Sequence, residues 1–108
     1  MKAVVKHIIQ SSIAAFHNEG LQVYAILEEA IKNSEPVELS FEGVERCATQ
    51  FLNAAIGKLY LQYEVHSIEQ ILSYNYGNLP HLSEKIQEVI DNALHAKEYD
   101  SLIANATA

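Results

Sequence analysis

The spacing of hydrophobic and polar residues changes in the middle of the chain, between residues 37 and 63. Val37, Leu39 and Phe41 alternate with polar residues, and a period of two is typical of a strand with one buried face. Farther along, apolar residues recur at helical spacing, namely Phe51, Leu52, Ala55, Ile56, Leu59 and Tyr63. The pattern therefore predicts a strand over 37–41, a short polar turn and a helix over about 50–63.

The N-terminal third is expected to contain strands followed by a helix. A run rich in Val and Ile over 3–9 favours a strand, and 13–16 is a candidate second strand that would form a hairpin with it. Asn18 is a suitable cap for a helix that continues to about Lys32. The predicted core stripe of this helix consists of Leu21, Tyr24, Leu27, Ala30 and Ile31.

One more strand and one long helix are expected in the C-terminal part. The strand is placed at 70–75, although residues 67–70 fit a helical turn equally well. After a turn over 75–80, a helix should end near Lys97. Its apolar stripe is Leu82, Ile86, Val89, Ile90 and Ala93.

The resulting order, β(β)-α-β-α-β-α, predicts an α/β fold, because strands separated by helices pair in parallel through right-handed crossovers. A strand covered on both faces would be apolar throughout, whereas Glu38, Ser40 and Glu42 predict a solvated face on the strand over 37–41. We therefore expect helices mainly on one face of a mixed or parallel sheet.

The length of 108 residues and the hydrophobic content of 49% fit one domain, which we place at 1–98 with a C-terminal tail at 99–108. Polar residues interrupt the N-terminal apolar run before it reaches the length of a signal peptide or membrane span. The single cysteine, Cys47, cannot form an internal disulfide, which fits a reducing compartment. A cytoplasmic protein is therefore expected.

The balance of acidic and basic residues indicates which kinds of binding partner the chain disfavours. Fourteen acidic and seven basic residues give a net charge of -7, which disfavours nucleic acid and anionic membrane surfaces. A protein partner is expected instead. The sequence also leaves homodimerisation open, because six tyrosines exceed the needs of so small a core.

No constellation of residues predicts catalysis, a metal site or a cofactor. The five histidines are scattered and belong to no set of metal ligands, and the glycines have no phosphate-binding spacing. Cys47 near a helix start could be a reactive thiol, but a small buried hydrophobic residue is the simpler interpretation. The polar segment 17–20 could line a pocket, and we interpret it as the entry turn of a helix.

The central segment resembles a bacterial STAS-like family of unknown function, whose members combine a "DFxGV" strand, a Ser/Thr-rich turn and an "FLN" helix. Here Phe41-Glu42-Gly43-Val44, Thr49 and Phe51-Leu52-Asn53 carry the resemblance. It implies a small sandwich related to the STAS domains of anti-sigma factor antagonists, and a regulatory role.

The resemblance also implies a site in the turn before the second helix. STAS antagonists accept a phosphate there on a serine within an Asp-Ser-Ser-Gly sequence, and Thr49 lies at the corresponding place. Ala48, Gln50 and Phe51 depart from that sequence. Thr49 is therefore a candidate phosphoacceptor, and the alternative is a plain helix N-cap.

The predicted fold and the family resemblance suggest two functions. In the first, Arg46, Thr49, Gln50 and Asn53 form an exposed edge that docks a protein partner, as STAS domains dock onto kinase-like ATPases of the anti-sigma type. In the second, the domain senses a small molecule or nucleotide at the carboxyl ends of its strands, without catalysis. An enzyme is the least expected outcome.

Overall fold

A three-stranded parallel sheet forms one side of the molecule, in the order β1-β3-β5. The structure is a computed structural model that describes the backbone of residues 1–107 and the side chains of residues 1–99. The strands are β1 (Lys2–Val4), β3 (Val37–Ser40) and β5 (Leu72–Asn75). Leu39 in the central strand lies opposite Ala3 and Tyr74. A second parallel sheet has only two strands, β2 (Ile13–Ala14) and β4 (Arg46–Cys47).

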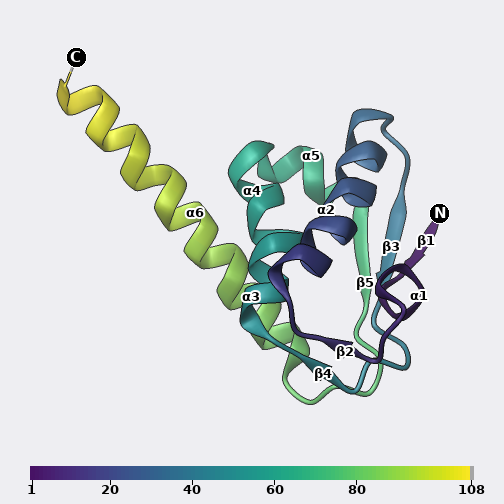
Figure 1. Cartoon of the computed structure of the whole chain (residues 1–108). Helices are drawn as coiled ribbons and strands as arrows, with labels where there is room; N and C mark the ends of the chain where they lie inside the picture. Colours follow the sequence, from purple (N-terminus) through teal and green to yellow (C-terminus); the bar gives the residue numbers. More distant parts are fainter. Residues whose placement is uncertain (108) are drawn as a thin grey trace.

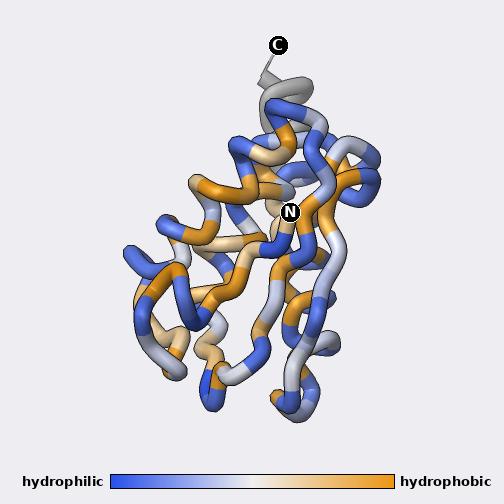
Figure 2. Tube along the Cα trace, turned by 90° about the vertical axis from the view of Figure 1, so that its right-hand side faces the viewer, coloured by the Kyte–Doolittle hydropathy of each residue, from blue (hydrophilic) through white to orange (hydrophobic). Residues whose placement is uncertain are grey.

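The larger helices pack on one side of the three-stranded sheet (Figure 1). The helical elements are α1 (Val5–Ile9), α2 (His17–Lys32), α3 (Thr49–Leu52), the π-helical segment η1 (Asn53–Gly57), α4 (Lys58–Gln62), α5 (Val65–Glu69) and α6 (Leu82–Thr107). Seen from the strand side in Figure 2, hydrophobic and hydrophilic residues are mixed along the strands. The predicted α/β class, with helices mainly on one face of a parallel sheet, is confirmed.

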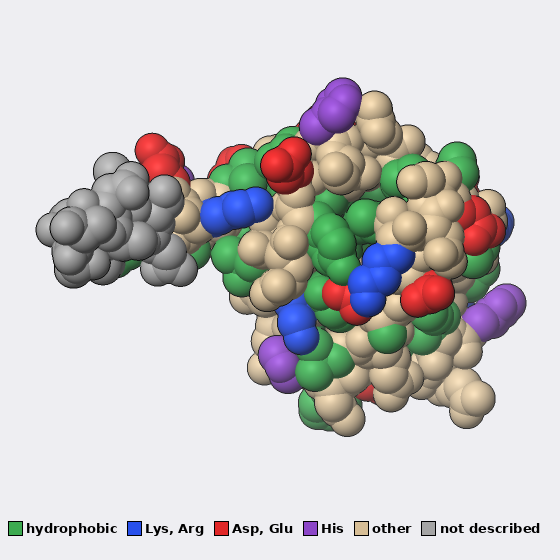
Figure 3. Space-filling model, turned by 90° about the horizontal axis from the view of Figure 1, so that it is seen from above, with side chains coloured by type: hydrophobic (Ala, Val, Ile, Leu, Met, Phe, Trp, Pro, Cys, Tyr) green, Lys and Arg blue, Asp and Glu red, His purple; other side chains and the backbone are tan. Residues whose placement is uncertain are grey.

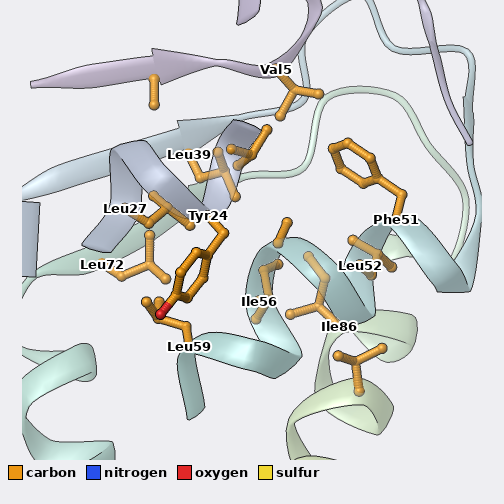
Figure 4. Close-up of a cluster of buried hydrophobic side chains, with 14 of the residues drawn as sticks. Val5, Tyr24, Leu27, Leu39, Phe51, Leu52, Ile56, Leu59, Leu72 and Ile86 are labelled. Atoms are coloured by element: carbon orange, nitrogen blue, oxygen red, sulfur yellow. The ribbon is translucent and has the colours of Figure 1, made fainter. Parts of the chain in front are cut away.

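The core lies between the sheet and these helices. Val37, Leu39 and Phe41 are all buried, as their alternation predicted. Figure 4 shows the side chains of Val5 and Leu39 on the sheet side, with those of α2, the helical run from α3 to α4, and α6 facing them. Most residues of the predicted helical stripes are also buried, whereas Leu21, Ile31 and Tyr63 are half-buried. The buried members are Tyr24, Leu27, Ala30, Phe51, Leu52, Ala55, Ile56, Leu59, Leu82, Ile86, Val89, Ile90 and Ala93.

The N-terminal segment differs from its prediction. The expected strand over 3–9 ends at Val4, and the following five residues form α1. β2 pairs with β4 and not with β1, so the predicted hairpin is wrong. Val5 and Ile9 stand one helical turn apart and are both buried, while Lys6 and His7 between them are exposed. Burial of that face outweighs the strand preference of β-branched residues.

Several boundaries also differ. Asn18 is not a cap, because α2 already begins at His17 with Phe16 as N-cap and no side-chain cap bond. The sequence signal missed β4 and left α5 undecided, since two and five residues are too short for a clear periodicity. α6 does not end near Lys97 but continues to Thr107, through a segment without glycine or proline.

The face of β3 that was predicted to be solvated is only partly so. Glu42 is exposed, but Glu38 is half-buried and Ser40 is fully buried. The Ser40 hydroxyl accepts a hydrogen bond from the Glu42 backbone N–H at 3.3 Å, so its burial leaves its polar atom paired.

α2 crosses the helical run from α3 to η1 at very short range. A Cβ atom placed on Gly20 would lie 2.5 Å from the carbonyl oxygen of Phe51 and 2.7 Å from Cβ of Ala54. Only glycine therefore allows this crossing, which positions the start of α3 against α2.

Among the helices described here, none combines the length and the apolar character needed to cross a membrane. α6 extends well beyond the other helices (Figure 1).

Candidate functional site

The four residues predicted for partner binding lie together where β4 passes into α3. Arg46 is on β4, Thr49 and Gln50 open α3, and Asn53 follows one turn later. All four side chains are exposed. We call Arg46, Thr49, Gln50 and Asn53 the junction surface.

The last residue of β2 and the residue after it hold this junction in place. The Ala48 N–H donates to the carbonyl oxygen of Ala14 at 2.8 Å, and Gln50 Nε2 donates to the carbonyl oxygen of Ala15 at 2.6 Å. The next residue, Phe16, is 60% exposed, and Ile13 on β2 is 45% exposed. Two large exposed apolar side chains thus flank the residues that support the junction surface. No motif or periodicity in the sequence marks either residue.

Thr49 is not the cap of α3. Ala48 occupies the N-cap position with extended backbone angles, and no side chain caps the helix. Thr49 is the first helical residue, and its hydroxyl makes no hydrogen bond to the part of the chain whose side chains are described. The N-cap interpretation is therefore wrong, while phosphorylation of this exposed hydroxyl stays a prediction.

Cys47 is half-buried and packs against the core. Burial raises the pKa of its thiol to about 11, against a smaller opposite effect from the Lys85 ammonium. The thiol is therefore protonated near neutral pH, which fits a small hydrophobic residue better than a nucleophile.

A groove of about 560 Å³ borders the junction surface. Its lining residues belong to β2, β4, the connection that leads into α6 and the start of α6. Figure 1 shows β2, β4 and this connection at the carboxyl end of the three-stranded sheet. The groove is lined by Ile13, Ala14, Ala15, Glu45, Arg46, Cys47, Ala48, Leu79, Pro80 and Lys85. Its volume falls within the range of about 300–1,000 Å³ that is usual for small-molecule sites.

Charge is distributed differently in the groove and over the whole chain. Two basic residues, Arg46 and Lys85, and one acidic residue, Glu45, line the groove. The Glu45 carboxylate accepts a hydrogen bond from the Ser12 hydroxyl at 3.0 Å. On the face seen from above in Figure 3, side chains of both signs are interspersed.

The Asn75 side chain makes two local hydrogen bonds where β3 and β5 end. Asn75 Nδ2 donates to Glu42 Oε1 at 3.2 Å, and Asn75 Oδ1 accepts from the Gly77 N–H at 3.0 Å. Gly77 has a positive φ of 61°, and a Cβ there would lie 2.6 Å from the Phe41 carbonyl oxygen. This turn is therefore restricted to glycine by both backbone angle and space.

Metal binding has no support among the side chains that the structure describes, because no group of three or more His, Cys, Asp or Glu residues is placed to hold an ion. His81 Nδ1 lies 3.1 Å from Glu84 Oε2, an exposed pair one helical turn apart. The segment 17–20, which could have lined a pocket, is the first turn of α2.

A polar cluster, which no sequence motif marks, lies farther along α2. Glu28 accepts hydrogen bonds from the hydroxyls of Tyr24 at 2.6 Å and Tyr63 at 2.9 Å. These two bonds hold the pKa of Glu28 below its ordinary value, and Lys32 adds to the effect. The Lys58 ammonium lies 4.7 Å from the centre of the Tyr24 ring. The cluster joins α2 to the end of α4, and it has the character of a structural clamp.

The fold and the arrangement of the central segment define a STAS-like α/β domain. A family model described as a STAS-like domain of unknown function (DUF4325) matches residues 19–80, which is more than half of the chain. The chain belongs to this family, as the resemblance in its central segment predicted. No curated protein and no solved structure matches it.

Proposed function

We propose that this domain is a small regulatory module that docks a protein partner on the junction surface. One observation carries the proposal: all four of the residues predicted for binding are exposed at one place, where β4 passes into α3. Exposed Ile13 on β2 and exposed Phe16 flank the residues that support this surface. Aromatic and arginine side chains are enriched at the centres of protein interfaces, so this composition supports docking.

The finer form of the proposal names a kinase-like ATPase of the anti-sigma type as the partner and the cytoplasm as the compartment. Its support is the family relationship to STAS-like domains. A phosphate on Thr49 would add about 1.5 to 2 negative charges to the junction surface and would weaken docking by opposing burial against the partner. The proposal includes no catalytic step and no role for nucleic acid or membrane.

Affinity capture from the native cytosol tests the docking function. Arg46→Glu and Thr49→Asp should each reduce recovery of a partner that wild type retains, because a new negative charge must then be buried at the contact. Thr49→Asp should not reduce stability, since an acidic residue in the first turn favours the helix dipole.

Two matched variants control for the charge itself. Lys6→Glu repeats the change of Arg46→Glu on α1, and Ser67→Asp repeats that of Thr49→Asp within α5. Both positions are exposed. Recovery of the same partners at the same level with wild type and all four variants would refute docking at the junction surface.

The groove supports a second candidate, a sensor for a small molecule or nucleotide. Its position at the carboxyl end of the sheet is where ligands of open α/β sheets bind. Ligand binding to the folded state raises the melting temperature. A thermal-shift screen with common nucleotides and cytosolic metabolites should then find a ligand whose effect is lost in Lys85→Glu. Partner capture that depends on Arg46, together with no thermal shift, would favour docking over sensing.

A further inference from the structure

One edge of β4 is unpaired. In its pairing with β2, the Arg46 N–H faces the Ser12 carbonyl oxygen at 3.5 Å, and the Ala48 N–H donates to Ala14. Backbone groups of successive residues point to opposite edges of a strand, so the N–H and C=O of Cys47 point away from β2. Neither group has a hydrogen-bond partner within the described part of the chain.

The outer edge of β2 differs, because a side chain closes it. The Ile13 N–H donates to Ser11 Oγ at 3.0 Å, and that hydroxyl lies 3.3 Å from the Ile13 carbonyl oxygen. Of the two edges of this small sheet, only that of β4 therefore offers a free donor and a free acceptor from the same residue.

Cys47 lines the groove together with Leu79, Pro80 and Lys85 from the connection into α6 and the start of that helix. No backbone hydrogen bond joins Cys47 to these residues within the described part of the chain. Figure 1 shows β4 lying between β2 and the connection that leads into α6. The free edge of β4 thus borders an open groove with several apolar lining residues, and strand addition uses an exposed sheet edge of this kind.

The charged residues that line the groove favour one kind of bound segment over another. Arg46 and Lys85 against Glu45 leave one net positive charge in the lining (two minus one), in a chain whose net charge is -7. Glu45 is also engaged by Ser12. An acidic segment is therefore favoured here over a basic one.

We propose that the outer edge of β4 accepts an extended, acidic segment of the partner protein as a third strand, paired to the N–H and C=O of Cys47. This inference rests on the docking function proposed above and specifies its chemistry. Main-chain hydrogen bonds to Cys47 provide the register, while alternate side chains of the segment contact the apolar lining residues and the two basic residues of the groove.

The probe for this site is a capped six-residue peptide of alternating valine and glutamate, titrated into the full ¹⁵N-labelled chain. The Cys47 amide should shift, and its hydrogen exchange should slow at least about tenfold at saturation because it gains an acceptor. A peptide of alternating valine and lysine should bind roughly tenfold more weakly. No protection of the Cys47 amide by the acidic peptide would overturn the proposal.

Backbone methylation separates strand addition from binding through side chains alone. Two versions of the acidic peptide carry N-methyl groups, one on the valines and one on the glutamates, so each blocks the donors of one edge. Strand addition predicts that one version loses at least about tenfold in affinity while the other binds nearly as the parent does. Equal effects of the two versions would refute pairing to β4.

Variants of the chain test the charge argument and distinguish this inference from the docking function. The double variant Arg46→Glu and Lys85→Glu should weaken the acidic peptide about tenfold, whereas Lys6→Glu should leave it unchanged. An unchanged spectrum elsewhere confirms that each variant is folded. If a captured partner depends on Arg46 but leaves the Cys47 amide unprotected in the complex, strand addition is wrong and docking stands.

Discussion

The close crossing of α2 over η1 makes Gly20 the position where the packing can be tested most sharply. In Gly20→Ala, the new methyl group would lie 2.5 Å from a backbone oxygen and 2.7 Å from Ala54 Cβ. Ordinary contacts begin near 3.4 Å, so the two helices must separate by most of the difference, 3.4 − 2.5 = 0.9 Å. The obstacle includes backbone, which cannot rotate away.

Two effects of opposite sign determine the stability of this variant. Overpacking of a tight core typically costs about 1–3 kcal/mol, and a backbone obstacle places Gly20→Ala at the upper end. Alanine in a helix interior recovers about 1 kcal/mol relative to glycine. The free energy of unfolding should therefore fall by about 2 kcal/mol, which moves the urea midpoint down by roughly 1 M.

Gly57→Ala is the matched control for this measurement. Gly57 is also a buried helical glycine, but its nearest neighbour is a side-chain methyl group, Val89 Cγ1, at 3.2 Å. A shift of a few tenths of an ångström in that side chain admits the new methyl group. The gain in helix propensity should keep this variant within about 1 kcal/mol of wild type. Equal urea midpoints for wild type and Gly20→Ala, or a larger loss in Gly57→Ala, would refute the packing argument.

Three further predictions concern single side chains. Thr49→Ala should change the free energy of unfolding by less than about 0.5 kcal/mol, because no cap bond is lost, and a loss near 1 kcal/mol in urea denaturation would restore the N-cap interpretation. Glu28 has a folded-state pKa below its unfolded value, so its contribution is present above about pH 4.3 and is lost as the pH falls through the folded pKa. Denaturation at pH 7 and at pH 3 should thus show a stability difference between wild type and Glu28→Gln that shrinks in acid, whereas a constant difference would contradict the clamp. With a pKa of about 11, Cys47 should react with a disulfide reagent at pH 8 at least about tenfold more slowly in the folded protein than in urea; similar rates would contradict burial of the thiol.

The sequence alone was sufficient for the elements whose residues repeat over several turns or a full strand. Leu39 was placed at the centre of a core strand, and the stripe from Leu82 to Ala93 was placed on the last helix. Both patterns report which face of an element is buried, and that requirement is local to the element. The family could also be predicted from the central segment, because its characteristic residues stand at specific positions along a short stretch of sequence.

The N-terminal segment and the junction surface were decided only by the tertiary structure. Val5 and Ile9 are residue types that favour a strand, yet they lie one helical turn apart and both are buried in the core. β2 pairs with β4, which is more than thirty residues away in the sequence. Thr49 suits a cap by residue type, but the pairing of Ala48 with Ala14 places the helix start one residue earlier. The free edge of Cys47 and the groove beside it arise from segments that are distant in sequence. Contacts of that kind leave no periodic signal, because each depends on where the rest of the chain has already packed.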